Sequence, residues 1–166
     1  MEITKAGIES IPIIQHIANI TWSKAYKEII TNEQLEYMLK KMYSADSLKN
    51  QIQVLEHQFI LANFENKPVG FASFNIKQSI PEKIVKLHKI YVDPSRHGIG
   101  IGKSMLQYIM NEISLKGLTY LELNVNRQNT AIGFYKKLGF KIIAEEDIPI
   151  GNGFFMNDYV MQISCL

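Results

Sequence analysis

Ile90–Leu106 reads IYVDPSRHGIGIGKSML, and local structure follows from it directly. A β-branched and aromatic run ends at Asp93-Pro94, three glycines follow at alternate positions in 98–102, and an apolar periodic segment begins at Lys103. Glycines let the backbone approach a ligand closely. The first N–H groups of a helix have no partner within it and lie at the positive end of its dipole. The stretch therefore predicts a strand, a glycine-rich turn and a helix start that bind an anion, with pyrophosphate as the favoured ligand.

Three phosphate-binding motifs compete for this segment. The P-loop, G-x-x-x-x-G-K-S/T, fits at residues 102–104, but His97 stands where its first glycine belongs. The dinucleotide fingerprint G-x-G-x-x-G begins at residues 98–100, but Lys103 replaces its third glycine. The third pattern is Q/R-x-x-G-x-G/A. The segment HGIGIG at 97–102 fits this pattern, with His97 in place of the first Gln or Arg. It is the pyrophosphate loop of the GNAT superfamily of N-acetyltransferases, which the chain resembles.

A second segment, LTYLELNVNRQNTAIGFYKKLGF at 118–140, supports this resemblance. The late signature of the superfamily is a strand, an Asn and then A-x-x-F-Y-x-x-x-G-F. The residues in matching places are Ala131, Phe134, Tyr135, Gly139 and Phe140. Asn129 precedes this run by two residues, whereas many members have a gap of three. The alternative interpretation is a generic α/β protein with a glycine-rich turn and an amphipathic helix.

Composition agrees with one enzyme domain over 1–166. The 166 residues suit a single domain, and a hydrophobic share of 46% argues against disorder. A net charge of +2 gives no reason to expect nucleic acid as a partner. The only cysteine, Cys165, allows no intrachain disulfide, which is compatible with a reducing cytosol. No signal-peptide pattern and no stretch near ~18 apolar residues is found, so we expect a cytoplasmic protein without a membrane partner.

Periodicity and turn residues predict the order of elements. The expected strands are 2–6, 58–64, 69–76, 84–92, 118–125, 140–145 and 154–163, and the expected helices are 8–26, one capped by Thr31-Asn32, one capped by Ser44, about 100–117, and 130–138. The resemblance implies an α/β fold, α+β in some schemes. It is a single GNAT-type domain with a central mixed, mostly antiparallel sheet of about seven strands, splayed between the fourth and fifth strands and flanked by helices.

The resemblance implies acetyl-CoA as the co-substrate and no metal. The pantetheine arm would enter the splay, where an amide-bearing arm can act as a surrogate strand. The implied cofactor-binding residues are Ile90, Tyr91, Val92, His97, Gly98, Ile99, Gly100, Ile101, Gly102, Lys103, Asn129 and Tyr135. His97 can contact phosphate through its side chain or contribute only its backbone. Asn129 can bind the pantetheine arm, cap the following helix, or do both.

Acetyl transfer from a thioester to an amine needs a neutral amine, donors for the oxyanion and a proton for the departing thiolate. The superfamily places its general acid at the tyrosine matched by Tyr135, and a phenol with a pKa of ~10 is protonated at pH 7. The alternative role of Tyr135 is core packing. The general base is open, because Lys86 stands where one branch has a catalytic Glu. The candidates are His88, Glu122, a water chain and a C-terminal residue.

The resemblance implies that the first two helices, their loop and the last hairpin wall the acceptor site. These supply Trp22, Tyr26, Tyr37, Tyr43, Asp158 and Tyr159, and we take Trp22, Tyr26 and Asp158 as substrate-binding candidates. Aromatic rings with a carboxylate suit a cationic amine, although core packing is the alternative for each ring. The general plan resembles the bacterial spermidine/spermine acetyltransferase branch. The acetyltransferases of ribosomal-protein N-termini share these motifs, and a non-catalytic acyl-CoA-binding domain and a homodimer are further hypotheses.

Overall fold

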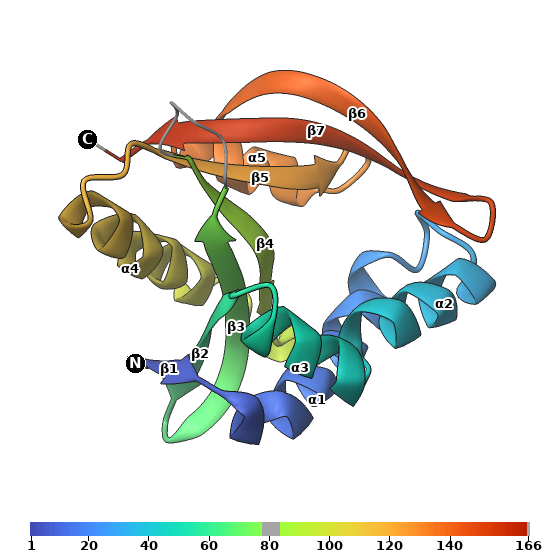
Figure 1. Cartoon of the computed structure of the whole chain (residues 1–166), viewed down its shortest axis with the longest axis horizontal. Coiled ribbons are helices and arrows are strands. Elements are labelled where there is room, and N and C mark those ends of the chain that lie inside the picture. Colours follow the sequence, from blue (N-terminus) through green and yellow to red (C-terminus); the bar gives the residue numbers. More distant parts are fainter. Residues whose placement is uncertain (78–83, 166) are drawn as a thin grey trace. The chain divides into compact units, whose positions relative to one another are not determined.

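The computed structural model describes residues 1–77 and 84–165 (Figure 1). The strands are β1 (Glu2–Ala6), β2 (Gln58–Phe64), β3 (Lys67–Ile76), β4 (Ile84–Val92), β5 (Tyr120–Asn126), β6 (Lys141–Gly151) and β7 (Phe154–Ser164). The helices are α1 (Ile11–Ala25), α2 (Asn32–Tyr43), α3 (Ala45–Gln53), α4 (Ile101–Leu115) and α5 (Ala131–Lys137), with 3-10 turns η1 (Ile8–Ser10) and η2 (Pro94–Arg96). None of the helices in the described part of the chain has the length and apolar character needed to cross a membrane.

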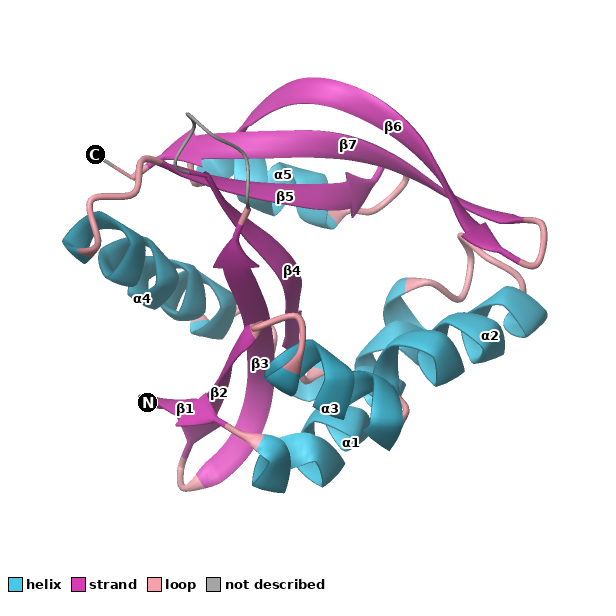
Figure 2. Cartoon of the chain, viewed as in Figure 1, coloured by secondary structure: helices cyan, strands magenta, loops and turns pink. Residues whose placement is uncertain are grey.

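The seven strands form one sheet in the order β1-β2-β3-β4-β5-β7-β6 (Figure 2). Strands β1–β2, β2–β3, β5–β7 and β6–β7 pair antiparallel, and β4–β5 pair parallel. This confirms the predicted mixed, mostly antiparallel sheet flanked by helices. The parallel ladder comprises the pairs from Ile84–Tyr120 to Leu87–Leu123, and the splay beyond it stays a prediction.

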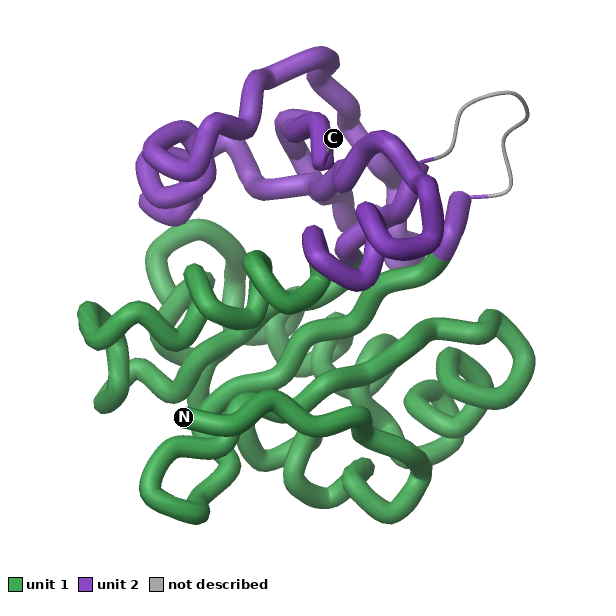
Figure 3. Tube along the Cα trace, turned by 90° about the vertical axis from the view of Figure 1, so that its left-hand side faces the viewer, with its two compact units in different colours: residues 1–75, 88–109 green, residues 76–87, 110–166 purple. Residues whose placement is uncertain are grey.

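The chain divides into two compact units (Figure 3). Unit 1 comprises Met1–Asn75 and His88–Ile109, and unit 2 comprises Ile76–Leu87 and Met110–Leu166. Strand β4 and helix α4 each begin in one unit and end in the other. The single domain over 1–166 stays a prediction, and the two units are described separately below.

Unit 1 buries both faces of β3, because successive residues of a strand point to opposite sides. Phe71 makes an edge contact with Tyr43 at the end of α2, with ring centroids 6.2 Å apart. On the other side, a Cβ at Gly70 would lie 3.3 Å from the Met105 side chain on α4 and 2.9 Å from the Tyr91 carbonyl oxygen. Glycine at position 70 therefore allows the close approach of β4 and α4 to β3.

Unit 2 packs α5 against a sheet of β5, β7 and β6, and α5 lies behind these strands in Figure 2. Leu121, Leu123 and Val125 are buried on β5 and alternate with polar residues. The alternation gives this part of the sheet an apolar face and a polar face. The polar face carries Glu122 and Asn124, which belong to the candidate site below.

Local signals predicted the helix starts well. The Thr31 hydroxyl accepts a hydrogen bond from the Gln34 N–H at the start of α2, and the Ser44 hydroxyl accepts one at the start of α3. The expected helix over 8–26 instead consists of η1 followed by α1. Pro12 lies in the first turn of α1, where its missing N–H costs no intrahelical hydrogen bond.

Strand β6 is longer than expected, since pairing with β7 extends it from the predicted end at residue 145 to Gly151. Asp147 and Pro149 are poor strand formers, but β6 is the edge strand, where proline is tolerated. The predicted glycine turn joins the two strands: Asn152 and Gly153 have φ values of +54° and +74°, as a two-residue hairpin turn requires.

Candidate active site

The predicted pyrophosphate loop follows β4 in unit 1. Gly98 and Gly100 both have φ of +86°, so they adopt the left-handed backbone that favours glycine. A Cβ at either position would meet no atom within 4 Å, which leaves open space beside the loop. Helix α4 begins at Ile101 and carries the exposed Lys103 in its first turn. The loop N–H groups, the helix start and this ammonium fit a pyrophosphate.

His97 folds back onto the end of β4. Its Nε2 lies 3.0 Å from the carbonyl oxygen of Val92. The Asp93 carboxylate accepts a hydrogen bond from the Ser95 N–H at 2.8 Å, and the Asp93 N–H donates to the Val69 carbonyl at 2.7 Å. These contacts hold the entry to the loop. They favour the backbone, rather than the side chain, as the contribution of His97 to phosphate binding.

The end of β4 is fixed by an aromatic cluster. The Tyr91 ring lies 6.0 Å from Trp22 and 5.7 Å from Phe71, measured between centroids. Ile90 and Val92 flank it and are half-buried. The predicted contacts of these backbone groups with a pantetheine arm stay predictions.

Trp22 and Tyr26, taken as substrate-binding candidates, lie in the core of unit 1. Trp22 is 1% exposed, its ring centroid lies 4.5 Å from that of Tyr26 with the planes tilted by 35°, and its indole N–H donates to the Tyr43 hydroxyl at 3.1 Å. Tyr26 is also buried. This burial favours core packing for Trp22 over direct contact with an acceptor.

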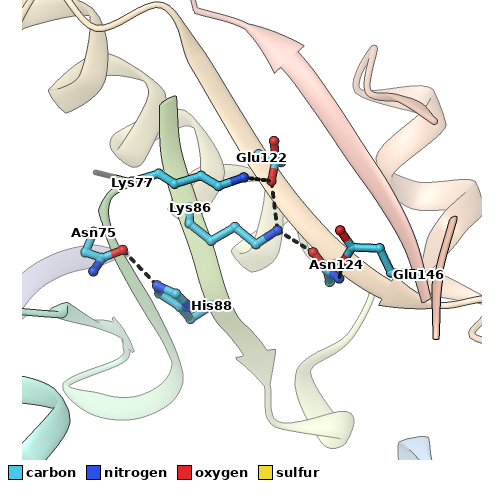
Figure 4. A network of polar contacts seen from close by, with 7 residues as sticks. All are labelled: Asn75, Lys77, Lys86, His88, Glu122, Asn124 and Glu146. Atoms are coloured by element: carbon cyan, nitrogen blue, oxygen red, sulfur yellow. Dashed lines mark hydrogen bonds and ion pairs between the residues drawn. The ribbon is translucent and has the colours of Figure 1, made fainter. Parts of the chain in front are cut away.

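His88 is oriented by Asn75 (Figure 4). Its Nε2 lies 2.8 Å from Asn75 Oδ1, and Asn75 Nδ2 donates to the Leu55 carbonyl at 3.3 Å. Because the Leu55 carbonyl oxygen can only accept, the amide nitrogen of Asn75 faces it, and the amide oxygen of Asn75 faces His88 and accepts there. Nε2 of His88 therefore carries the hydrogen, and in neutral His88 the lone pair is on Nδ1.

A second histidine stacks on His88. The rings of His57 and His88 are 4.0 Å apart and 8° from parallel. Burial, and then the nearby Lys89 ammonium, lower the pKa of His57 to about 4. His57 is therefore neutral at pH 7 and adds no charge beside His88.

Unit 2 holds a charged network around Glu122, the second candidate base (Figure 4). Glu122 is 4% exposed, and its Oε1 accepts hydrogen bonds from Lys86 Nζ at 3.0 Å and from Lys77 Nζ at 3.3 Å. Lys86 also donates to Asn124 Oδ1. Burial alone would raise the pKa of Glu122, but the two ammonium groups hold it below its usual value. Glu122 is thus ionised at neutral pH and a weak base.

Asp158 lies on β7 opposite Glu146 of β6 and Asn126 of β5. It is 5% exposed. Burial raises the pKa of its carboxyl group; a side-chain hydrogen bond with Asn124 works against this shift, and the neighbouring charge of Glu146 adds to it. Asn124 Nδ2 donates to Glu146 Oε2 at 3.0 Å, as Figure 4 shows.

Tyr135 and Asn129 lie at α5 in unit 2. Tyr135 is 7% exposed, and its ring makes an edge contact with Phe140 at 5.6 Å. The side-chain oxygen of Asn129 accepts a hydrogen bond from the Ala131 N–H at 2.8 Å, so Asn129 contacts the start of α5, although the N-cap residue of this helix is Thr130. Its contact with pantetheine, and the acid role of Tyr135, stay predictions.

Sequence reasoning missed Lys89, Asn124 and Glu146. Lys89 is buried in a strand whose flanking residues gave no sign of a partner. Asn124 shares a face with Glu122, and the period of two along β5 was the available signal. Glu146 fell outside the strand expected to end at residue 145. The described residues contain no group of three or more potential metal ligands.

The sequence matches the acetyltransferase (GNAT) domain family over residues 26–162, so the chain belongs to the GNAT acetyltransferases. It is an acyltransferase with acetyl-CoA as co-substrate. The match runs through both units and includes the glycine loop and the helix that carries Tyr135.

Several relatives support the assignment. The chain is 29% identical to a spermidine N(1)-acetyltransferase of Thermoplasma acidophilum over 147 residues, covering 86% of this chain and 89% of the relative. A solved PaiA N-acetyltransferase of Thermoplasma acidophilum in complex with coenzyme A superposes with a TM-score of 0.82 at 27% identity, covering 98% of each chain. A peptidyl-lysine N-acetyltransferase of Salmonella typhimurium is 34% identical over 85 residues, which cover 51% of this chain and 50% of the relative.

Proposed function

We propose that this enzyme transfers the acetyl group of acetyl-CoA to a primary amine, with a polyamine as the favoured acceptor. The observation that carries the acceptor class is the similarity to the spermidine acetyltransferase over most of both chains. The buried carboxyl group of Asp158 supports it, because a cationic amine complements a carboxylate.

The proposed step is direct attack by the neutral amine. The nitrogen forms a bond to the thioester carbonyl carbon, and the C–S bond then breaks. Tyr135 gives its hydroxyl proton to the departing sulfur. The amine loses one proton to a base, and the acetylated amine and CoA are the products.

His88 is the base that we favour. The Asn75 contact orients its ring, and the stacked His57 is neutral at pH 7, so His57 itself adds no charge that would oppose protonation of His88. Water relays the proton if the acceptor lies beyond the reach of His88. We assign Glu122 to holding the Lys86 ammonium, because a carboxylate bound by two cations takes up a proton poorly.

The decisive test is Tyr135→Phe, which removes only the hydroxyl group. We expect kcat to fall by about 100-fold or more, since general acids contribute effects of this size, while CoA affinity changes little. Steady-state CoA release and calorimetric binding of CoA measure the two quantities. Tyr108→Phe on α4 is the matched control. Equal turnover by Tyr135→Phe and wild type would exclude Tyr135 as the acid.

A peptide amine is the second candidate acceptor, favoured by the peptidyl-lysine relative that matches half of this chain. A panel of spermidine, simple amines and peptides with free N-terminal or lysine amines separates the two. Saturable turnover on peptides alone would replace the polyamine proposal. CoA binding without turnover on any acceptor would favour the acyl-CoA-binding hypothesis.

A further inference from the structure

We propose that Asp158, Glu146 and Asn124 bind a second, non-reacting ammonium group of the acceptor. Preferred acceptors would then carry at least two cationic nitrogens. This inference rests on the proposed amine acetylation and adds the site that selects among amines. All three residues lie in unit 2, on adjacent strands of one sheet.

Strand register brings the three side chains to one face. Asp158 of β7 is directly opposite Glu146 of β6 and Asn126 of β5. Asn124 lies two residues before Asn126, so it points to the same side of the sheet. The hydrogen bond from Asn124 Nδ2 to Glu146 Oε2, 3.0 Å long, ties β5 to β6 across β7.

The carboxyl group of Asp158 is incompletely satisfied. The residue is 5% exposed, and its Oδ1 accepts no hydrogen bond from the described residues. A buried carboxylate oxygen without a donor is strongly unfavourable. Glu146 directly opposite adds repulsion between like charges. The site therefore calls for a positive group or for a proton on Asp158.

The cations nearby are already engaged. The Arg127 guanidinium hydrogen-bonds to Glu145 and Asp147. The Lys86 ammonium hydrogen-bonds to Glu122 and Asn124. These contacts leave Asp158 Oδ1 without a donor from either side chain. An ammonium group from the acceptor supplies one.

The three side chains suit an ammonium group better than a metal ion. Carboxylate and amide oxygens accept hydrogen bonds from N–H groups. Lys86 gives an example in this sheet, because its ammonium hydrogen-bonds both the Glu122 carboxylate and the Asn124 amide oxygen. The described residues offer no cluster of three metal-ligating side chains.

The test compares 1,4-diaminobutane with n-butylamine, which has the same carbon chain and one nitrogen. The full chain acetylates each amine, and the ratio of the two kcat/KM values reports the second ammonium. We expect wild type to favour the diamine. Asp158→Asn and Glu146→Gln should each lower the ratio, by about tenfold for Asp158→Asn, because a hydrogen bond to a charged group is lost.

Glu145→Gln is the matched control, since Glu145 neighbours Glu146 in sequence but pairs with Tyr159 and bonds Arg127. It should leave the ratio unchanged. Calorimetric titration of 1,4-diaminobutane into each CoA-loaded protein gives a readout that needs no turnover. Glu146→Gln keeps the test decisive if Asp158→Asn does not fold.

The outcomes separate the two proposals. Diamine binding that weakens in Asp158→Asn or Glu146→Gln supports the ammonium site, even if no amine is acetylated and the proposed function fails. Acetylation of both amines with an equal ratio in wild type and variants overturns the site while leaving the proposed function intact. Undetectable diamine binding by the wild type also overturns the site.

Discussion

Lys86 and Lys89 lie three residues apart on β4, yet each is held by a different kind of partner. In unit 2, Lys86 Nζ lies 3.0 Å from the Glu122 carboxylate. In unit 1, Lys89 Nζ donates to the amide oxygen of Gln51 at 2.6 Å and lies over the rings of Tyr43 and Phe59. The positive charge of Lys86 is therefore paired with a carboxylate, whereas that of Lys89 contacts only neutral groups among these partners.

The difference shows what burial does to a cation. Burial lowers the pKa of Lys89 to about 8, because an amide and two ring faces do not replace the water that is lost. At Glu122 the effect of burial is outweighed by the two ammonium groups, and its pKa falls. The same strand therefore carries one cation that destabilises the folded protein and one that helps to hold the sheet together.

The largest expected effect is the pH dependence that Lys89 imposes on folding. The folded-state pKa lies below the ordinary value of 10.5, so the unfolded chain binds more protons between pH 8 and 10.5. The free energy of unfolding of wild type should therefore rise by about 3 kcal/mol over this range, relative to Lys89→Met. Urea unfolding of both proteins at a series of pH values measures the difference.

Lys89→Met should also be as stable as wild type, or more stable, at pH 7, since a buried cation is replaced by an apolar side chain of similar length. Parallel stability curves for the two proteins between pH 8 and 10.5 would contradict the assignment of a shifted Lys89. Lys24→Met, at the exposed end of α1, serves as the control lysine.

The next largest effect on stability is expected from removing the charge of Glu122, the carboxylate partner of Lys86. Glu122→Gln leaves two ammonium groups facing a neutral amide, and we expect a loss of about 2 kcal/mol at pH 7, between the values for exposed and buried pairs. The contribution of the ionised Glu122 is present above its usual pKa of 4.5 and is lost as the pH falls through its lower folded value. Denaturant unfolding of wild type and Glu122→Gln measures the stability difference at pH 7 and its decrease in acid.

A double-mutant cycle tests whether the pair acts as a unit. Glu122→Gln should cost less in a Lys86→Met background than in wild type. Equal losses in the two backgrounds would mean that Lys86 and Glu122 are not coupled.

The smallest effect on stability is expected from giving Lys89 a carboxylate partner like that of Lys86. Gln51→Glu gives Lys89 a carboxylate but removes the amide N–H that donates to the Met42 carbonyl at 2.8 Å. The gain and the loss should nearly cancel at pH 7, within about 1 kcal/mol. The rise in stability between pH 8 and 10.5 should shrink, because the carboxylate raises the pKa of Lys89. An unchanged pH dependence would show that Gln51 does not set the environment of Lys89.

Short-range signals in the sequence were sufficient for part of this structure. The glycine loop, the caps at Thr31 and Ser44 and the turn at Asn152-Gly153 each depend on a few adjacent residues. Backbone conformation at these sites follows from residue type, so it can be predicted without knowing the tertiary contacts.

The partners of charged groups could not be predicted in this way. Glu122 meets Lys77 and Lys86, which are more than thirty residues earlier, and Lys89 meets Gln51 across a similar separation. Both contacts depend on strand register and helix packing, which residue type does not reveal. The extension of β6 beyond residue 145 likewise depends on its partner β7 and outweighs the weak strand propensity of Asp147 and Pro149.

The far end of the β6–β7 hairpin differs from its base. The last pair between β5 and β7 is Asn126–Asp158, whereas β6 and β7 continue together to Gly151–Phe154. Within the described residues the end of the hairpin is thus a two-stranded ribbon, an arrangement that is only marginally stable by itself. Insertions and deletions there disturb no third strand. Over evolutionary time this ribbon can therefore diverge quickly in length and composition, while the carboxylates at its base stay fixed by the sheet.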